Sequence, residues 1–197
     1  QYISAAYYPA SLVFYPMESN LGYRPGVSKE VFACLDDEQV NVYRDICNQL
    51  VLPSVSKEKP AVIGISIGTQ MQLMAGLTFC KMIKESFPEI RVVVGGNVVT
   101  RLQEEWAHHE RFFTEVFDAA ILYEGEHALL WYLEAVNGQR AIEQVPNLMY
   151  RDAAGVKQSK EVYTEKTAAL PLPDFDGLPL DRYFVPERII PYLATRG

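Results

Sequence analysis

Two short loops carry the residues best suited to contact a ligand. Ser66 and Thr69 place hydroxyl groups on either side of Gly68, where the apolar run Ala61–Ile67 ends. Such hydroxyls could donate hydrogen bonds to the amide or phosphate groups of a ligand. A second apolar run ends at Gly95-Gly96-Asn97, where paired glycines allow a backbone to approach a ligand closely. Each loop also has a structural interpretation, which is helix capping for the hydroxyls and a tight turn for the glycines.

A third loop, Glu124-Gly125-Glu126, places two carboxylates around a glycine. These could accept hydrogen bonds from the hydroxyl or amide groups of a ligand, or they could cap the helix expected from His127. His127, directly after Glu126 at a strand–helix junction, is the one histidine expected near a pocket. His108 and His109 are adjacent on a predicted helix and point in different directions, so they are a poor metal pair and should face solvent. The residues offer no nucleophile–base arrangement and no catalytic carboxylate pair, so they predict a binding module.

The loops follow three predicted strands that alternate with predicted helices. The strands are Ala61–Ile67, Arg91–Val94 and Asp118–Tyr123, and the helices are Gln70–Phe87, Leu102–Phe113 and His127–Asn137. This alternation predicts an α/β fold, with a Rossmann-like (flavodoxin-like), mostly parallel sheet and helices on both faces. The apolar runs Ala61–Ile67 and Arg91–Val94 should form strands that are buried on both faces. Ligands bind at the carboxyl ends of the strands in such sheets, which is where all three loops are expected.

Helical periodicity predicts which residues face the core. In the helix Gln70–Phe87 the expected buried face follows steps of three and four, whereas Lys81 and Glu85 should face solvent. The expected buried residues of this helix are Leu73, Gly76, Cys80, Ile83 and Phe87. Gly76 should let this helix approach the sheet closely. In the helix from His127 the expected core residues are Leu129, Leu133 and Val136.

The segments on either side of this region are less regular. Upstream we expect a strand at Leu12–Tyr15, a helix over Lys29–Leu35 capped by Ser28, and a helix from about Gln39 to Leu52 with Val42, Ile46, Gln49 and Leu50 near one face. Downstream we expect a hairpin of Leu148–Arg151 and Val156–Gln158, and then a linker rich in proline. The linker prolines are Pro171, Pro173, Pro179, Pro186 and Pro191. The predicted domains are residues 1–146 for the α/β domain and 147–197 for the hairpin and linker.

Composition excludes several classes of protein. The chain has 197 residues, and its formal net charge of -7 without a basic cluster argues against a nucleic-acid surface. No segment reads as a membrane span or a targeting signal. Three cysteines without CxxC spacing argue against disulfides and structural zinc, and favour a cytoplasmic location. Because the chain starts without Met and stops after the apolar run Ile189–Leu193, we expect it to be a fragment of a longer protein.

The order of these motifs resembles the cobalamin-binding (B12-binding) domain that precedes the radical S-adenosylmethionine (radical SAM) domain in a large family of proteins. The resemblance covers about two-thirds of the chain, and its motifs are specific only in combination. They are Val62–Ile67, Val92–Gly96, Phe117-Asp118 with Glu124-Gly125-Glu126, Asn147–Arg151, Leu170–Tyr183 and Ala194–Gly197.

The resemblance implies that the chain binds cobalamin. The family's tail contacts carry over to Ser66, Thr69, Gly95 and Gly96, with Asn97 beside them and Glu124, Gly125 and Glu126 on the adjoining loop. The Asp-x-His-x-x-Gly motif of the mutases is absent, which implies base-off binding without a histidine ligand. Residues before Ala61 match the family least well, and a first strand of the sheet is expected upstream.

In that family a Thr/Ser-Arg-Gly run is followed by a CxxxCxxC motif. The [4Fe-4S] cluster and S-adenosylmethionine are therefore expected only in a downstream radical SAM domain, joined in cis. Cys34, Cys47 and Cys80 do not have this spacing. The parent reaction would be a methyl transfer to, or a rearrangement at, an unactivated carbon. The alternative is a flavodoxin-like regulatory or interaction domain without a cofactor.

Overall fold

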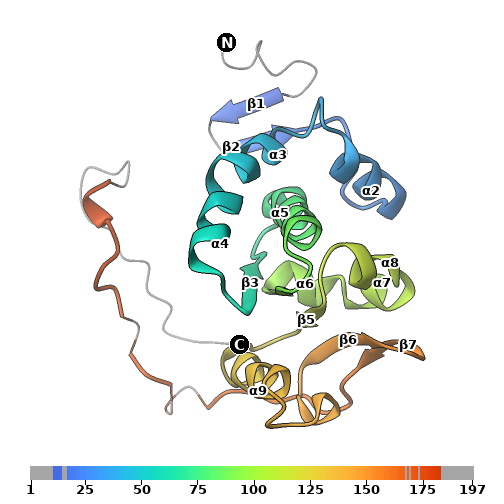
Figure 1. Ribbon diagram of the computed structural model, residues 1–197, viewed down its shortest axis with the longest axis vertical. Coiled ribbons are helices and arrows are strands. Elements are labelled where there is room, and N and C mark those ends of the chain that lie inside the picture. Colours follow the sequence, from blue (N-terminus) through green and yellow to red (C-terminus); the bar gives the residue numbers. More distant parts are fainter. Residues whose placement is uncertain (1–10, 15–16, 167, 169, 173, 183–197) are drawn as a thin grey trace. The chain divides into compact units, whose positions relative to one another are not determined.

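The structure is a computed structural model that describes residues 11–14, 17–166, 168, 170–172 and 174–182. The chain forms two compact units, residues 1–163 and 164–197 (Figure 1). The predictions for Tyr15, Pro173, Tyr183, Pro186, Ile189–Leu193 and Ala194–Gly197 fall outside the described residues. In the part of the chain that is described, no helix combines the length and the apolar character needed to cross a bilayer.

The first unit is built on an open, mixed sheet of five strands. Its strands are β3 (Val62–Ser66), β4 (Arg91–Gly95), β5 (Ala119–Ile121), β6 (Leu148–Asp152) and β7 (Gly155–Gln158), in that order. β3, β4 and β5 run parallel, which confirms the α/β class and the order of the three predicted strands. β6 and β7 are antiparallel additions, so the sheet is parallel in its first part and not throughout.

The hairpin β6–β7 belongs to this sheet. Tyr150 is the partner of Ala119 and Leu148 is the partner of Ile121, so β6 extends the sheet beyond β5. Each strand extends one residue further than predicted, to Asp152 and Gly155, which pair and close a turn through Ala153 and Ala154. The side chain of Asp152 accepts a hydrogen bond from the Ala154 N–H at 2.7 Å. The structure therefore divides the chain after Tyr163, whereas we placed the boundary between residues 146 and 147.

β3 is an edge strand among the described strands, unlike the strand buried on both faces that we expected. Ile63, Ile65 and Ile67 pack into the larger core cluster on one face. On the other face Gly64 and Ser66 are exposed. β4 does match the expectation, since Val92–Val94 is fully buried. Apolar runs of similar composition thus occupy an edge and a central position.

Two layers of helices cover the first face of the sheet. α5 (Leu73–Ser86) packs on β3 and β4, and the 3-10 helix η2 (Gln70–Gln72) directly precedes it in the chain. An outer layer then covers α5, as Figure 1 shows. This layer consists of α2 (Ser28–Asp36), α3 (Val42–Ile46), the π-helix η1 (Cys47–Val51) and α4 (Leu52–Glu58).

The second helix layer explains where the predictions for α5 succeed and fail. Gly76 does face the sheet, because a Cβ there would lie 2.8 Å from Ile67 Cδ1. Lys81 was expected in solvent but is buried, with Nζ 2.7 Å from Asp36 Oδ1 and 2.8 Å from Glu85 Oε1. Because α2 covers α5 on the side away from the sheet, the amphipathic pattern of α5 predicts too little burial, although Glu85 is exposed as predicted. The carboxylate of Asp36 comes from the covering helix α2 and neutralises the lysine.

The amino-terminal segment differs from the prediction in three places. β1 (Ser11–Phe14) pairs antiparallel with β2 (Met17–Asn20), a strand that we did not predict. Ser28 is the first residue of α2, and the N-cap position belongs to Val27. The predicted second helix continues to Glu58 through Pro53, which is tolerated in the first turn of α4. The π-helix η1 changes which side chains of this helical segment share a face, and Ile46 and Leu50, predicted on the same face as Val42, are exposed.

Three short helices replace the single helix predicted after β4. They are α6 (Asn97–Arg101), α7 (Gln103–His108) and α8 (Arg111–Glu115). The predicted anchors Trp106 and Phe113 are buried, and Trp106 packs edge-on against Phe112 and Phe117. The indole N–H of Trp106 donates to the Val99 carbonyl at 3.0 Å, which ties α7 to α6.

α9 (Glu126–Val136) covers the second face of the sheet. Its fully buried residues are Ala128 and Tyr132, whereas the predicted core residues Leu129 and Val136 are each 37% exposed. The helix is apolar on almost every side, so periodicity alone could not fix which stripe faces the sheet. A 3-10 helix, η3 (Ile142–Gln144), then leads into β6.

The second unit contains one short element among its described residues. This element is the 3-10 helix η5 (Leu180–Arg182). A turn precedes it, in which the Leu178 N–H donates to the Phe175 carbonyl at 3.3 Å. Leu172 is 91% exposed, as expected for linker sequence that packs little of its own apolar surface.

Candidate functional site at the carboxyl edge of the sheet

The first two predicted loops meet where β3 and β4 end. Ser66 is the register partner of Gly95. Beyond them the Ile67 N–H donates to the Gly95 carbonyl at 2.7 Å, and the Val98 N–H donates to the Ile67 carbonyl at 3.2 Å. The parallel strands therefore bring Ser66, Gly95 and Gly96 to one edge, as the sequence predicted.

The backbone conformation and close packing at position 96 require glycine, whether or not a ligand binds there. Its φ of 104° is unfavourable for residues with a side chain. A Cβ at this position would lie 2.7 Å from the carbonyl oxygen of Ile67, and backbone cannot move aside cheaply. Gly95 differs, since a Cβ there would make an ordinary contact of 3.6 Å with the Ile121 oxygen. The tight-turn interpretation therefore accounts for Gly96, and Gly95 is free of that constraint.

The first loop is organised by a glutamine that sequence reasoning missed. Gln72 Oε1 accepts hydrogen bonds from the backbone N–H groups of Gly68 at 2.9 Å and Thr69 at 3.1 Å. Thr69 is the N-cap residue of η2, in line with the capping alternative. A ligand at this loop would therefore meet the hydroxyls of Ser66 and Thr69, because the nearby amides already have an acceptor.

The third loop is fastened to α6. Tyr123 has a left-handed φ of 57°, and its N–H donates to Thr100 Oγ1 at 2.7 Å. Gly125 is the N-cap residue of α9, and Glu126 begins the helix. A carboxylate in the first turn interacts favourably with the helix dipole, but neither Glu124 nor Glu126 takes the predicted N-cap position. The third loop is therefore joined to the helix that follows the second loop. Asn97, the last residue of the second loop, is exposed at the start of that helix.

The side chain of Asn147 anchors the third loop by hydrogen bonds. This buried side chain donates from Nδ2 to the carbonyls of Glu124 at 3.0 Å and Tyr163 at 2.8 Å. Its Oδ1 accepts the Tyr163 N–H at 2.9 Å. The backbone φ of 58° at Asn147 is one that asparagine tolerates better than most residues. An asparagine directly before a strand was therefore the available signal for this role.

His127 lies beside the third loop within an aromatic cluster. Its ring centroid is 5.3 Å from that of Trp131 and 5.5 Å from that of Tyr163. The other two histidines lie elsewhere, with His108 exposed and His109 Nε2 3.3 Å from Ser28 Oγ. Among the described residues, no group of three or more His, Cys, Asp or Glu side chains is placed to hold a metal ion.

Small residues leave part of the sheet uncovered at this edge. Gly64, Ser66 and Gly95 lie on the face of β3 and β4 that α9 covers farther along, since their neighbours Val62 and Val93 pack in the α9 cluster. A Cβ on Gly64 would have Val93 Cγ1 at 3.9 Å as its nearest neighbour. This strip, Gly64–Ser66–Gly95, therefore has room beside it for an elongated group.

The three cysteines all lie within the described residues and are buried free thiols. Burial raises the pKa of Cys47 to about 11 and that of Cys34 to about 12, so both stay protonated at neutral pH.

Comparisons of the chain with protein-family models, with curated proteins and with solved structures found no match.

Proposed function

We propose that residues 1–163 form the cobalamin-binding module of a radical SAM protein, with a Rossmann-like arrangement of the strands β3, β4 and β5. The observation that supports this most is the meeting of three motif loops at one edge. Ser66, Gly95 and the loop before Glu126 come from three separate parts of the resemblance, and the parallel register of β3, β4 and β5 puts them side by side. An α/β sheet binds ligands at such an edge.

In this proposal the nucleotide tail lies along the strip Gly64–Ser66–Gly95. The exposed Ser66 hydroxyl donates to its polar atoms, and the absence of side chains at Gly64 and Gly95 provides the space. Thr69 and Asn97 supply further polar contacts at the rim. Cobalamin, when bound, supplies the organometallic chemistry, which for the parent would be methyl transfer or rearrangement.

Two residues predicted to contact the cofactor, Gly96 and Glu126, take supporting roles in this proposal. Gly96 supports the loop through its contact with the Ile67 backbone, so it acts on the ligand indirectly. Glu126 stabilises the start of α9, and Glu124 and Gly125 shape the adjoining loop. Binding is base-off without a histidine ligand in this proposal. The [4Fe-4S] cluster and S-adenosylmethionine belong to a radical SAM domain outside these residues.

A regulatory or interaction domain without a cofactor is the second candidate. The observation that favours it is the outer surface of α9, where Leu129 and Leu130 are 37% and 51% exposed. An apolar helix surface of this kind is typical of a contact with another protein. The two candidates differ in a simple way, since only the first requires the strip Gly64–Ser66–Gly95 to be open.

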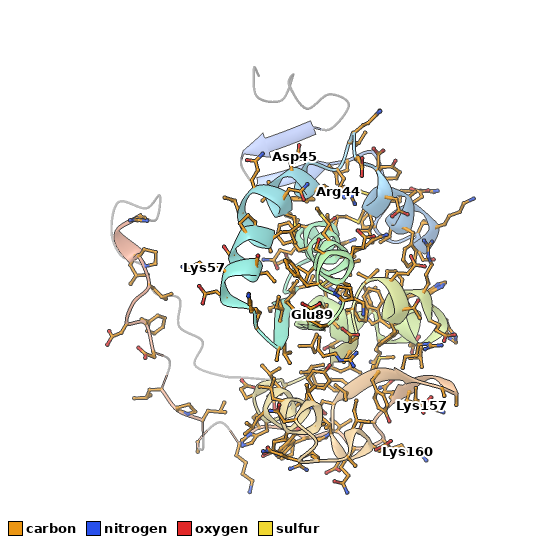
Figure 2. The ribbon with its side chains drawn as sticks, in the orientation of Figure 1. Arg44, Asp45, Lys57, Glu89, Lys157 and Lys160 are labelled. Carbon is orange, nitrogen blue, oxygen red and sulfur yellow. The ribbon has the colours of Figure 1, made fainter. Side chains whose placement is uncertain are left out.

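The experiment is retention of hydroxocobalamin. Purified protein is incubated with hydroxocobalamin and desalted, and the corrin absorbance per protein is measured. We expect wild type to retain corrin and Gly64→Val to lose it, because the added side chain projects over the open strip. The control is Lys157→Val, which places valine at an exposed position on β7 (Figure 2).

The variant is expected to fold, because valine favours strands and a Cβ at Gly64 meets nothing closer than 3.9 Å. Absence of retained corrin in the wild-type protein would contradict the proposal and favour the interaction domain. Equal retention by wild type and Gly64→Val would place any binding away from the strip.

A further inference from the structure

A large cleft lies at the opposite, amino-terminal edge of the same sheet. It has a volume of about 590 Å³, which falls in the range of small-molecule sites. Its residues come from helices on both faces of the sheet and from the sheet itself. They are Lys84 on α5, Arg91 on β4, Phe113 and Thr114 on α8, Asp118, Tyr132, Ala135 and Val136 on α9, Ile142, and Tyr150 and Arg151 on β6. All of them belong to the first unit.

The charged residues of the cleft are mainly cations. Lys84 Nζ lies 2.7 Å from Asp118 Oδ1, and Arg91 Nη1 lies 3.3 Å from the same oxygen. The other oxygen of Asp118 accepts the Val92 N–H at 2.8 Å. One carboxylate, already bonded through both oxygens, therefore serves two cations.

The third cation of the cleft, Arg151, pairs through Nε with Glu110. With Glu110 included, the group holds three cations and two carboxylates, in a chain whose formal net charge is -7. The side chains of Arg91 and Arg151 are 57% and 41% exposed. A guanidinium carries five N–H donors, and each contacts its carboxylate here through a single nitrogen.

The remaining wall is apolar and aromatic. Phe113 and Tyr132 are 4% and 2% exposed, and Ala135, Val136 and Ile142 lie on the α9 side. Burial raises the pKa of Tyr132 to about 12, so its hydroxyl remains protonated at neutral pH and can donate a hydrogen bond. The cleft thus has a cationic side and an apolar side, which a ligand of matching polarity could bridge.

We propose that this cleft binds a small organic anion, in which an apolar ring or short chain carries a carboxylate or phosphate group. Arg91 binds the anionic group together with Lys84, because a guanidinium matches the geometry of both oxyanions. The apolar body lies against Val136 and Ile142. This inference is independent of the cobalamin proposal, since the two sites occupy opposite edges of the sheet.

The test compares four probes that separate charge from apolar surface. Phenyl phosphate and benzoate carry both features, inorganic phosphate carries only the charge, and benzyl alcohol carries only the ring. Binding is measured by titration calorimetry and by NMR chemical-shift changes on the full chain. We expect saturable binding of phenyl phosphate or benzoate, at least about tenfold tighter than inorganic phosphate or benzyl alcohol. Which of the two binds better identifies the anionic group.

Substitutions then locate the site. Arg91→Gln should weaken binding of the better probe about tenfold or more, since a charge-assisted hydrogen bond is lost. Val136→Trp should also weaken binding, because the new ring fills the cleft from a position that is 37% exposed and tolerates size. The control is Lys57→Gln, an exposed cation at the end of α4 (Figure 2).

Three results would overturn the inference: no saturable binding of phenyl phosphate or benzoate, binding of inorganic phosphate or benzyl alcohol as tight as that of the better probe, or unchanged binding of the better probe to Arg91→Gln. Thermal unfolding of each variant, recorded in the same buffer, distinguishes a lost site from a lost fold.

Discussion

The two edges of the central sheet are built in opposite ways. At the carboxyl edge, polar groups such as Gln72 and Asn147 bond mainly to the chain's own loops, and small residues leave space. At the amino edge, cationic side chains such as Lys84 and Arg91 line a cleft in which the cations outnumber the carboxylates. The two proposed sites therefore rest on different evidence, which is a set of loop motifs at one edge and a charged cleft at the other.

The largest effect on stability should come from the tight approach at the carboxyl edge. Gly96→Ala should destabilise the protein by roughly 3 kcal/mol, because its φ of 104° disfavours a side chain and its Cβ would meet the Ile67 backbone. Urea unfolding measures this change. The matched control is the neighbouring Gly95→Ala, expected to cost less than about 1 kcal/mol, since its Cβ makes only ordinary contacts. Similar losses in both variants would contradict this explanation of Gly96.

The central carboxylate of the amino edge should give the next effect. Asp118→Ala removes the partner of Lys84, whose side chain is only 17% exposed, and the acceptor of the Val92 N–H. The expected loss is about 2 kcal/mol, most of it from leaving partly buried groups without a partner. Glu58→Ala, which removes an exposed partner of Lys57, should cost less than about 0.5 kcal/mol. If the two substitutions cost the same, Asp118 does not organise this edge.

A pH titration should give an effect of similar or smaller size. The folded-state pKa of Tyr132 is raised from 10.0 to about 12 by burial, so folding favours its protonated form. That contribution is fully present below about pH 10 and is lost as pH rises from 10 to 12. Wild type should therefore lose about 2 kcal/mol more than Tyr132→Phe over this range. Parallel curves for wild type and Tyr132→Phe would argue against its burial.

The sequence predicted the parts of the molecule in which contiguous residues decide the outcome. The strands at Val62 and Arg91, the burial of Trp106 and the approach of Gly76 to the sheet follow from local pattern. The meeting of Ser66 with Gly95 follows from parallel order alone.

Other features depend on elements far apart in the chain. Lys81 is buried because α2 covers α5, and Leu129 is exposed because α9 offers more apolar surface than the sheet can cover. The amino-edge cleft joins residues from Lys84 to Arg151, and no motif spans that distance. The role of Gln72 was also missed, since a glutamine after a loop carries no specific signal.

The most direct test places both edges in one binding assay with hydroxocobalamin. Corrin retention is measured for wild type, for Gly64→Val at the carboxyl edge and for Arg91→Gln at the amino edge. We expect wild type and Arg91→Gln to retain corrin equally, and Gly64→Val to retain none. Loss of corrin in Arg91→Gln with retention in Gly64→Val would instead place the cofactor at the amino edge. No retention by wild type would contradict cobalamin binding.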